Sequence, residues 1–370
     1  MARLNSICGM KMGQSPDSSS YNENGKGIPF FQGNADFGVI HPTVRVWCDA
    51  PTKIAYEGDI LISVRAPIGA LNIANTECCI GRGLAALTVD ETVCDKQYLW
   101  YGLASKVDEL NSKGTGSTFK AISKNVLAET EIPLPTIDIQ KQISLKLDNV
   151  CNLISLRKQQ LSKLDELVKS RFIELFGDTP DGEKVAMADI CRIITDGTHQ
   201  PPKFVSEGIP FLFVSNIVTN EIRYDAQKFI SEETYAELIK RTPIAIGDIL
   251  LSTVGSYGHP AVVKTEKPFC FQRHIAYLKP NADIVDSEYL RGAILSADVQ
   301  RQIDEGVKGI AQKTLNLSEI RKIRLPLPPI ELQEQFAAFV EQTDKSKFEI
   351  QKSLEKLETL KKALMQKYFG

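Results

Sequence analysis

The side chains best suited to chemistry in this sequence are its eight cysteines and its four histidines, His41, His199, His259 and His274. The histidines have no metal-ligand spacing, and no two cysteines form a Cys-X-X-Cys pair. Asp196 and His199, in Asp-Gly-Thr-His, would suit a catalytic dyad, but nothing nearby supplies a nucleophile and a base in order. The sequence has no nucleotide-binding Gly-X4-Gly-Lys-Ser/Thr loop. We therefore predict no catalytic residue and no metal site.

Two glycine-rich segments are instead typical of loops that contact phosphate groups. Gly-Thr-Gly-Ser-Thr at 114–118 precedes Lys120, and Gly-Val-Lys-Gly at 306–309 precedes Lys313. The main-chain N–H groups of such a loop, together with a lysine ammonium group, bind backbone phosphates. The alternative interpretation is a flexible turn, and the sequence leaves both open.

The composition is that of an ordinary globular protein, with 43% hydrophobic and 24% charged residues among 370. No apolar run approaches the roughly 20 residues that are needed to cross a bilayer. The N-terminus has no apolar signal core, so we expect a cytoplasmic protein whose cysteines are reduced thiols.

The sequence contains an internal duplication with an offset of about 190 residues. Matching segments follow one another in the same order: Gly27–Phe30 with Gly208–Phe211, Gly58–Leu61 with Gly247–Leu250, Arg82 with Arg273, Tyr98-Leu99 with Tyr289-Leu290, and the Phe-Gly pairs at 176–177 and 369–370. One match could arise by chance, but an ordered series indicates two copies of one structural plan.

Each copy begins with a segment typical of a small α+β globule. Short apolar runs such as 59–64 and 248–254 are bounded by glycine or proline, which favours buried strands. Short helices are predicted at 97–112 and 286–305. We place the two globules at residues 1–136 and 179–329.

Each copy ends in a predicted long helix, at 137–178 and 330–370. Apolar residues recur in steps of three and four, a heptad pattern with no proline or glycine inside it. A helix of that length is about 60 Å long and is not stable alone in water with one apolar stripe. We therefore predict that the two helices pack on each other as an antiparallel coiled coil.

A prolyl-leucyl segment leads into both helices, as Ile132–Gln142 and as Leu325–Gln335. Together with the duplicated Gly-Asp-Ile-Leu segments and the two heptad helices, it resembles the specificity subunit of type I restriction–modification systems. The likeness covers nearly the whole chain. At the helix entry the first copy has Lys141-Gln142 where the second has Glu334-Gln335.

The resemblance implies two target-recognition domains, each of which reads one half of a bipartite double-stranded DNA sequence. It implies that the helices set the unread spacer and bind two methyltransferase subunits, with contacts expected at Gln140, Gln142, Gln333 and Gln335. S-adenosylmethionine and ATP are expected only in partner subunits, which include restriction motor-nuclease subunits where these exist. The chain itself is expected to bind no cofactor and to perform no chemistry.

Candidate DNA contacts follow from the side chains that recognise base edges and phosphates. Arg82 and Arg273 match between the copies, so we expect a general DNA contact there, with a structural ion pair as the alternative. Gln272 and His274 replace Gly81 and Gly83, so we expect them to read bases in the second half, with an ordinary polar loop as the alternative. The other candidates lie beside glycine or proline, where a solvated loop is the alternative: Gln32, Asn34, Arg65, His199, Gln200, Lys203, Ser215, Asn216, Ser256 and Tyr257.

Two other functions remain open from the sequence, a stand-alone DNA-binding regulator and a protein-interaction scaffold with duplicated adaptor domains. A net charge of −2 is unusual for a protein that binds DNA unaided. Either the basic side chains gather on one face, or a partner supplies much of the phosphate contact.

Overall fold

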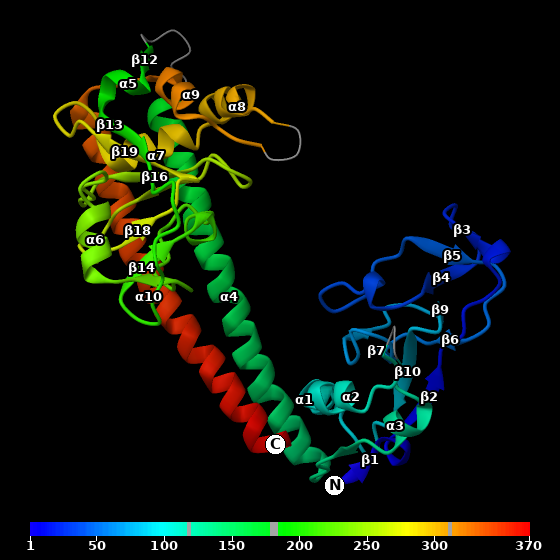
Figure 1. The fold of residues 1–370 in the computed structure, drawn as a ribbon. Helices are drawn as coiled ribbons and strands as arrows, with labels where there is room; N and C mark the ends of the chain where they lie inside the picture. The colour runs from blue at the N-terminus through cyan, green and yellow to red at the C-terminus, as the bar shows by residue number, and fades with distance from the viewer. Residues whose placement is uncertain (117–119, 178–183, 310–312) are drawn as a thin grey trace. The chain divides into compact units, whose positions relative to one another are not determined.

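The computed structural model describes residues 1–116, 120–177, 184–309 and 313–370, and the chain divides into two compact units (Figure 1). The first unit contains Met1–Lys158 with Lys352–Gly370, and the second contains Gln159–Gln351. Two long helices, α4 (Ile137–Phe176) and α10 (Ile330–Phe369), contribute to both units. The sequence-based boundaries set the helices apart from the globules, whereas each compact unit joins one globule to half of both helices.

In the described part of the first unit there are two larger β-sheets and one two-stranded sheet. The four-stranded antiparallel sheet has the order β2 (Cys8–Met12), β10 (Leu84–Val89), β7 (Ile60–Ser63), β8 (Leu71–Ile73). The five-stranded sheet has the order β3 (Tyr21–Asn22), β5 (Val46–Cys48), β4 (Ile28–Phe31), β9 (Cys78–Ile80), β6 (Ile54–Ala55), and its β4–β9 pair is parallel. A short pair, β1 (Ala2–Arg3) with β11 (Glu131–Ile132), precedes α4. The helices are α1 (Lys96–Ser105), α2 (Val107–Ser112) and α3 (Lys124–Ala128).

The second unit repeats this topology. Its four-stranded sheet has the order β13 (Cys191–Asp196), β19 (Ile275–Pro280), β16 (Ile249–Ser252), β17 (Pro260–Val262). Its second sheet has the order β15 (Phe229–Ile230), β14 (Ile209–Leu212), β18 (Cys270–Phe271), again with one parallel pair, β14–β18. The pair β12 (Lys184–Ala186) with β20 (Arg324–Pro326) corresponds to β1–β11. The helices are α5 (Met187–Ile190), α6 (Glu232–Leu238), α7 (Ser287–Ile294), α8 (Ala297–Gly306) and α9 (Leu317–Lys322).

The repeated Gly-Asp-Ile-Leu segment forms the same turn and strand in both units. Gly58 and Gly247 have positive φ angles of 87° and 91°, which glycine adopts without a Cβ clash. The following Asp59 and Asp248 are buried, and each carboxylate accepts the N–H of the residue three positions earlier, at 2.9 and 2.7 Å. The apolar residues then enter β7 and β16, the buried central strands. The motif is therefore structural in both copies.

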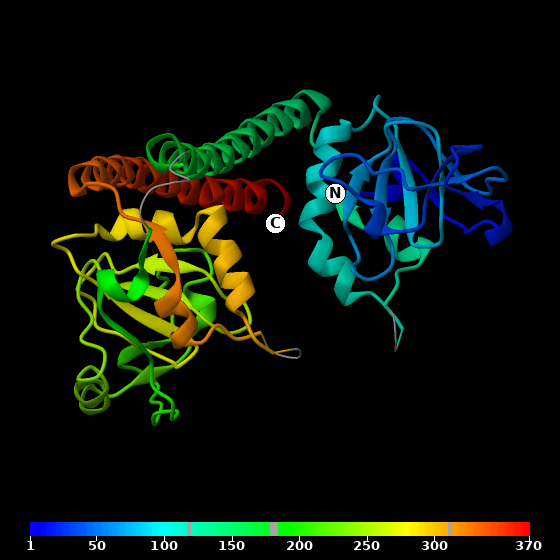
Figure 2. The same ribbon diagram turned by 90° about the horizontal axis from the view of Figure 1, so that it is seen from above.

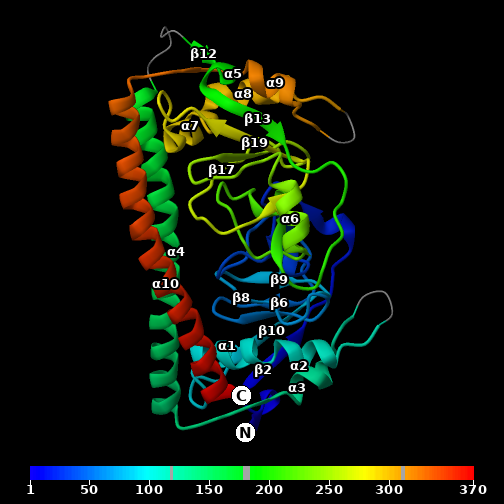
Figure 3. The same ribbon diagram turned by 60° about the vertical axis from the view of Figure 1, so that its left-hand side comes forward.

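The two long helices are antiparallel neighbours in both units, as predicted, and Figure 3 shows them side by side. In the first unit Lys158 Nζ lies 3.3 Å from Glu358 Oε1, and in the second Lys347 pairs with Asp165. The predicted stripe is buried at Ile143, Leu147 and Val150 of α4 but only half-buried from residue 154 to residue 175. A single partner helix covers less surface than a globule does, which accounts for the difference.

Each globule contacts the beginning of its own long helix and the end of the other one. In the first unit the Tyr98 ring of α1 lies 4.9 Å from the Phe369 ring at the end of α10. In the second unit the Tyr289 ring of α7 lies 4.8 Å from the Phe176 ring at the end of α4. Figure 2 shows α7 beside the helical pair of that unit. The matching Phe-Gly ends therefore complete the core of the opposite copy's globule.

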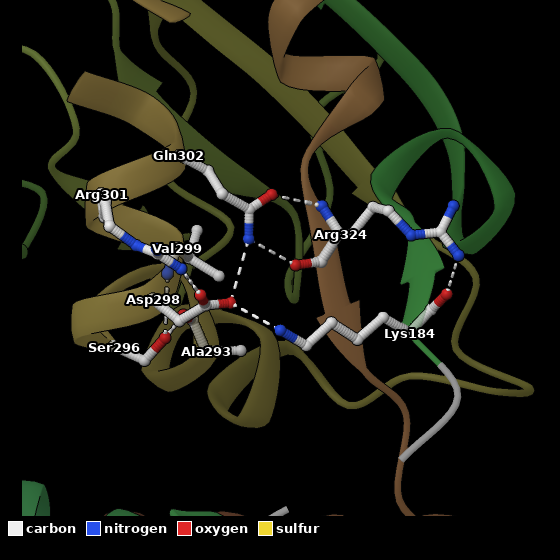
Figure 4. A network of polar contacts seen from close by, with 8 residues as sticks. All are labelled: Lys184, Ala293, Ser296, Asp298, Val299, Arg301, Gln302 and Arg324. Carbon is white, nitrogen blue, oxygen red and sulfur yellow. Dashed lines mark hydrogen bonds and ion pairs between the residues drawn. The ribbon is translucent and has the colours of Figure 1, made fainter. Parts of the chain in front are cut away.

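The second unit additionally ties β12 and β20 to α8 through a polar network (Figure 4). Asp298 Oδ2 accepts from Lys184 Nζ at 3.0 Å and from Gln302 Nε2 at 3.1 Å. Gln302 also donates to the Arg324 carbonyl at 2.8 Å and accepts the Arg324 N–H at 2.8 Å. The Lys184 hydrogen bond is the largest cause that lowers the pKa of Asp298. In the first unit the corresponding strand pair has a looser ion pair, Arg3–Glu131 at 3.9 Å.

All eight cysteines are free thiols, and burial raises the pKa of Cys8, Cys78, Cys94, Cys191 and Cys270 to about 12. Among the described ranges no helix has the length and apolar character to cross a bilayer, and no cluster of potential metal ligands occurs there. A cytoplasmic location stays a prediction.

Candidate nucleic-acid interface

Most of the predicted contact residues gather in one loop cluster at one end of the four-stranded sheet in each unit. We define the first loop cluster as residues 13–15, 31–34, 64–66, 81–83 and 115–122, of which 117–119 are outside the described residues. The second loop cluster is residues 197–199, 212–214, 253–255, 272–274 and 308–314, of which 310–312 are outside the described residues. Each cluster combines the ends of strands that are far apart in sequence.

Backbone hydrogen bonds hold the first loop cluster together. The Gly81 N–H donates to the Phe31 carbonyl at 2.8 Å, and the Val64 N–H donates to the Gly83 carbonyl at 2.9 Å. The Ala66 N–H donates to the Lys120 carbonyl at 3.0 Å. Because these bonds use main-chain groups alone, side chains on the segments can vary without loss of the arrangement.

The second loop cluster has the same bonds at the equivalent positions. The Gln272 N–H donates to the Leu212 carbonyl at 3.2 Å, and the Thr253 N–H donates to the His274 carbonyl at 3.0 Å. The Gly255 N–H donates to the Lys313 carbonyl at 3.2 Å. Arg273 therefore occupies the position of Arg82, and Lys313 occupies that of Lys120. All four residues are exposed. The backbone hydrogen bonds place each arginine in the same loop cluster as its lysine.

The clusters differ where the sequence places Gln272 and His274 opposite two glycines. A Cβ on Gly81 would lie 2.8 Å from Gln32 Oε1, and a Cβ on Gly83 would lie 2.5 Å from the Gln32 carbonyl oxygen. The side-chain amide of Gln32, which hydrogen-bonds Ser15 Oγ at 3.0 Å, therefore fills the space beside Gly81, and the main chain of Gln32 fills the space beside Gly83. In the second cluster Phe213 takes the place of Gln32. The polar side chains there, Gln272 and His274, come from the segment 272–274 that is equivalent to 81–83. Each cluster thus presents its amide from a different strand.

Several other predicted residues have defined environments in or near the clusters. Arg65 is exposed and bridges to Ala121, Asn34 is half-buried in a short 3-10 helix at 34–36, and Lys203 is exposed. Tyr257 donates its hydroxyl to Asp304 Oδ1 at 2.9 Å, and Lys313 Nζ lies 6.0 Å from the centre of its ring. Their roles in DNA binding stay predictions.

His274 is half-buried, and its pKa is lowered first by desolvation and then by the charge of Arg273. The neutral imidazole is thereby favoured, with one donor and one acceptor nitrogen. Arg273 Nε lies 3.4 Å from His274 Nε2. This pair offers a cation and a neutral hydrogen-bonding group side by side, a combination that the first cluster lacks at Arg82 and Gly83.

Three predicted contacts are corrected by burial. Asn216 is 7% exposed, and its amide accepts the Phe213 N–H at 3.0 Å and donates to the Arg223 carbonyl at 3.0 Å, so it closes a turn and is not available to a base. Gln140 and Gln333 have no exposed surface, so they cannot contact a partner subunit. Their neighbours Gln142 and Gln335 are exposed, and partner binding there stays a prediction.

The two buried glutamines make one shared set of hydrogen bonds instead. Gln140 Oε1 accepts the Asp95 N–H at 2.9 Å, and Gln333 Oε1 accepts the Asp286 N–H at 2.9 Å. Each Nε2 donates to two carbonyls, one of them on the prolyl-leucyl segment, from Pro135 at 2.8 Å and from Pro328 at 2.7 Å. The repeated glutamine therefore joins the helix entry to the globule.

Sequence reasoning missed Arg241, which lies after α6 in Lys-Arg-Thr-Pro and has no spacing that links it to the cluster. Its guanidinium group lies 2.5 Å from Asp196 Oδ1, at the end of β13. His199, which was predicted, lies 2.9 Å from the other oxygen of the same carboxylate. In the sequence, Asp-Gly-Thr-His indicates that Asp196 and His199 lie close together, but it does not indicate Arg241.

Comparison with known proteins adds three findings. The family model described as "Type I restriction modification DNA specificity domain" matches residues 1–166 and 181–362. A stretch of 158 residues is 41% identical to the type I restriction enzyme MjaX specificity subunit of Methanocaldococcus jannaschii, which covers 43% of this chain and 37% of that protein. The type I restriction enzyme EcoBI specificity subunit of Escherichia coli is 21% identical over 99% of this chain and 84% of its own length.

The fold is also that of a solved structure. The type I restriction–modification S subunit from M. genitalium has a TM-score of 0.63 and 17% sequence identity, and the match covers 100% of this chain and 95% of that one. At this identity the likeness concerns the fold alone, the duplicated α+β globules and the paired long helices.

Proposed function

Since the chain belongs to the type I restriction–modification DNA specificity family, we propose that each of its units reads one half of a bipartite DNA target. The observation that carries this proposal is the pair of loop clusters, which share their backbone hydrogen bonds but differ in their polar side chains. Two readers with one framework and different side chains suit two different half-sites. Matched cations, Arg82 with Arg273 and Lys120 with Lys313, suit the phosphates that both halves have in common.

The chain is a specificity subunit and leaves catalysis to partner subunits. We place S-adenosylmethionine on two methyltransferase subunits and ATP on restriction motor-nuclease subunits, where a system has them. Large apolar side chains that are exposed on the long helices could be covered by a protein partner, because burial of apolar surface favours association. They are Ile139, Leu145, Leu153, Leu156, Leu167 and Ile173 of α4 and Phe348 and Leu360 of α10, each 44–66% exposed.

The helices are proposed to set the number of unread base pairs between the half-sites. Each has 40 residues without a break, or about 60 Å. Equivalent groove positions on B-DNA recur at about 34–36 Å, so a helix pair of this length can serve two readers on one face of a duplex.

The decisive experiment is selection from a random duplex library by the full chain co-expressed with its methyltransferase subunit. Two short motifs at one constant spacing are expected. Replacement of residues 184–323 by the same region of a relative should then change one motif and leave the other. A single motif, or none, would contradict the bipartite reading.

A stand-alone regulator is the second candidate, and the same experiment distinguishes it. That protein would select its target without a methyltransferase subunit. The net charge of −2 and the exposed apolar residues of the helices both favour the subunit of a larger complex.

A further inference from the structure

At the end of β13, Asp196 holds two exposed donors, His199 in the second loop cluster and Arg241, which follows α6. Asp196 Oδ1 lies 2.5 Å from Arg241 Nη2, and Asp196 Oδ2 lies 2.9 Å from His199 Nε2. The carboxylate side chain is 15% exposed, whereas the arginine and histidine side chains are 52% and 51% exposed. The three groups therefore form a constellation whose acid is largely covered and whose donors face solvent.

The backbone beneath this constellation is tightly held. The residue after Asp196 is Gly197, whose N–H donates to the Ile275 carbonyl at 3.2 Å, and a Cβ there would lie 2.2 Å from the Phe271 carbonyl oxygen. The Thr198 carbonyl accepts the Arg273 N–H at 3.1 Å. Asp196 is thus connected through two residues to the predicted DNA contact Arg273.

The described residues of the first unit contain no carboxylate with two donors at the equivalent position. Gly13 donates its N–H to the Leu84 carbonyl at 2.9 Å as Gly197 does to Ile275, so Met12 is the counterpart of Asp196. Met12 is half-buried and packs against the core of its unit. At this position the second unit therefore has a carboxylate that is bonded to two donors, and the first unit has an apolar side chain.

An acidic side chain beside DNA is unfavourable through repulsion from phosphates unless it improves other contacts. Arginine offers five N–H donors and loses rotamer freedom when it binds, so a carboxylate that fixes it beforehand reduces that loss. We propose that Asp196 is a positioning residue that fixes Arg241 and His199 as DNA contacts of the second half-site. The partner atoms are acceptor atoms of DNA, on a phosphate or on a base edge. This inference rests on the proposed function of the loop clusters.

Asp196→Asn separates positioning from simple charge, because the two predict opposite signs. The substitution makes the surface more positive, which strengthens binding if Asp196 acts only by repulsion. Positioning predicts about tenfold weaker binding, with a similar loss for Arg241→Gln, and a double variant no weaker than the poorer single one. The measurement is the Kd of the full chain with its methyltransferase subunit on the selected duplex. A panel with each base pair of the second half-site replaced accompanies it.

Asp225→Asn is the matched control, since Asp225 also pairs with an arginine, Arg223 at 2.9 Å, but is 64% exposed. We expect its Kd to stay unchanged or to improve slightly. For Arg241→Gln, binding that is weakened through one base pair of the second half-site would assign Arg241 to a base edge. Binding that is weakened equally on all duplexes would assign Arg241 to a phosphate. Arg241→Gln, at an exposed position, keeps the test valid if Asp196→Asn impairs folding.

Unchanged or tighter binding by Asp196→Asn together with unchanged binding by Arg241→Gln would overturn the inference while leaving the proposed function intact. The proposed function is judged separately by the wild-type complex. If the wild-type complex selects no bipartite target, both fail together.

Discussion

The two loop clusters differ in side chains while their backbones are held alike. Gly81 leaves space for the side-chain amide of Gln32 in the first cluster and Gly83 for its main chain, whereas Gln272 and His274 stand at the equivalent positions in the second. The main-chain bonds between the segments are the same, for example 2.9 Å from Val64 to Gly83 and 3.0 Å from Thr253 to His274. A framework that depends on peptide groups alone lets one fold present different chemistry.

The attachment of each globule to the helices shows the opposite relation. There the side chains themselves are repeated, with Tyr98 and Gln140 matched by Tyr289 and Gln333. Tyr98 and Tyr289 donate their hydroxyls to the equivalent carbonyls of Pro133 and Pro326, at 2.9 and 2.5 Å. Buried hydrogen bonds between side chain and backbone leave little freedom, because each lost partner leaves a buried polar group unsatisfied. Variation is therefore found in the loop clusters and constancy at the helix junctions.

The largest expected effect tests that constancy. Gln140→Ala and Gln333→Ala should each lower the free energy of unfolding by about 2–3 kcal/mol, because each leaves one N–H and two carbonyls without a partner. Chemical denaturation of the full chain measures this, with the exposed Gln142→Ala and Gln335→Ala as controls that should change it by less than about 0.5 kcal/mol. A loss in only one unit would show that the two junctions are not equivalent.

A smaller effect is expected from the side chains that distinguish the clusters. Gln272→Ala should reduce discrimination at one base pair of the second half-site by roughly 1–3 kcal/mol and leave the first half-site unchanged. Competition between single-base variants of the selected duplex measures it. Gln227→Ala, an exposed glutamine of the same unit, is the control. A uniform loss over all sequences would remove Gln272 from the base-reading residues.

The smallest effect concerns the matched lysines. Lys120→Ala and Lys313→Ala should each weaken binding to every sequence and reduce the slope of log K against log salt by about one unit, since each releases one counterion fewer. Lys345, which pairs with Glu341 at 2.7 Å on α10, provides the control substitution. If the slope stayed the same for one lysine only, the clusters would differ in phosphate contact as well as in base reading.

The sequence by itself determined the duplication, the α+β class and the two long helices. These features depend on local patterns: the heptad spacing, the short apolar runs bounded by glycine or proline, and the absence of proline and glycine from 137–176 and 330–369. The predicted helix at 97–112 exists as α1 and α2, and that at 286–305 as α7 and α8. The sequence also identified Arg273 as the counterpart of Arg82, because the two arginines lie in matching segments of the duplication.

Only the tertiary structure decided which polar residues are available to a ligand. Asn216, Gln140 and Gln333 are residue types that often recognise ligands, but all three are buried. Their side-chain amides already form hydrogen bonds with backbone groups, near in the sequence for Asn216 and distant for the two glutamines. Arg241 reaches Asp196 across 45 residues of chain. Burial and such long-range contacts arise only when the strands assemble. The spacing of residues along the sequence therefore does not predict them.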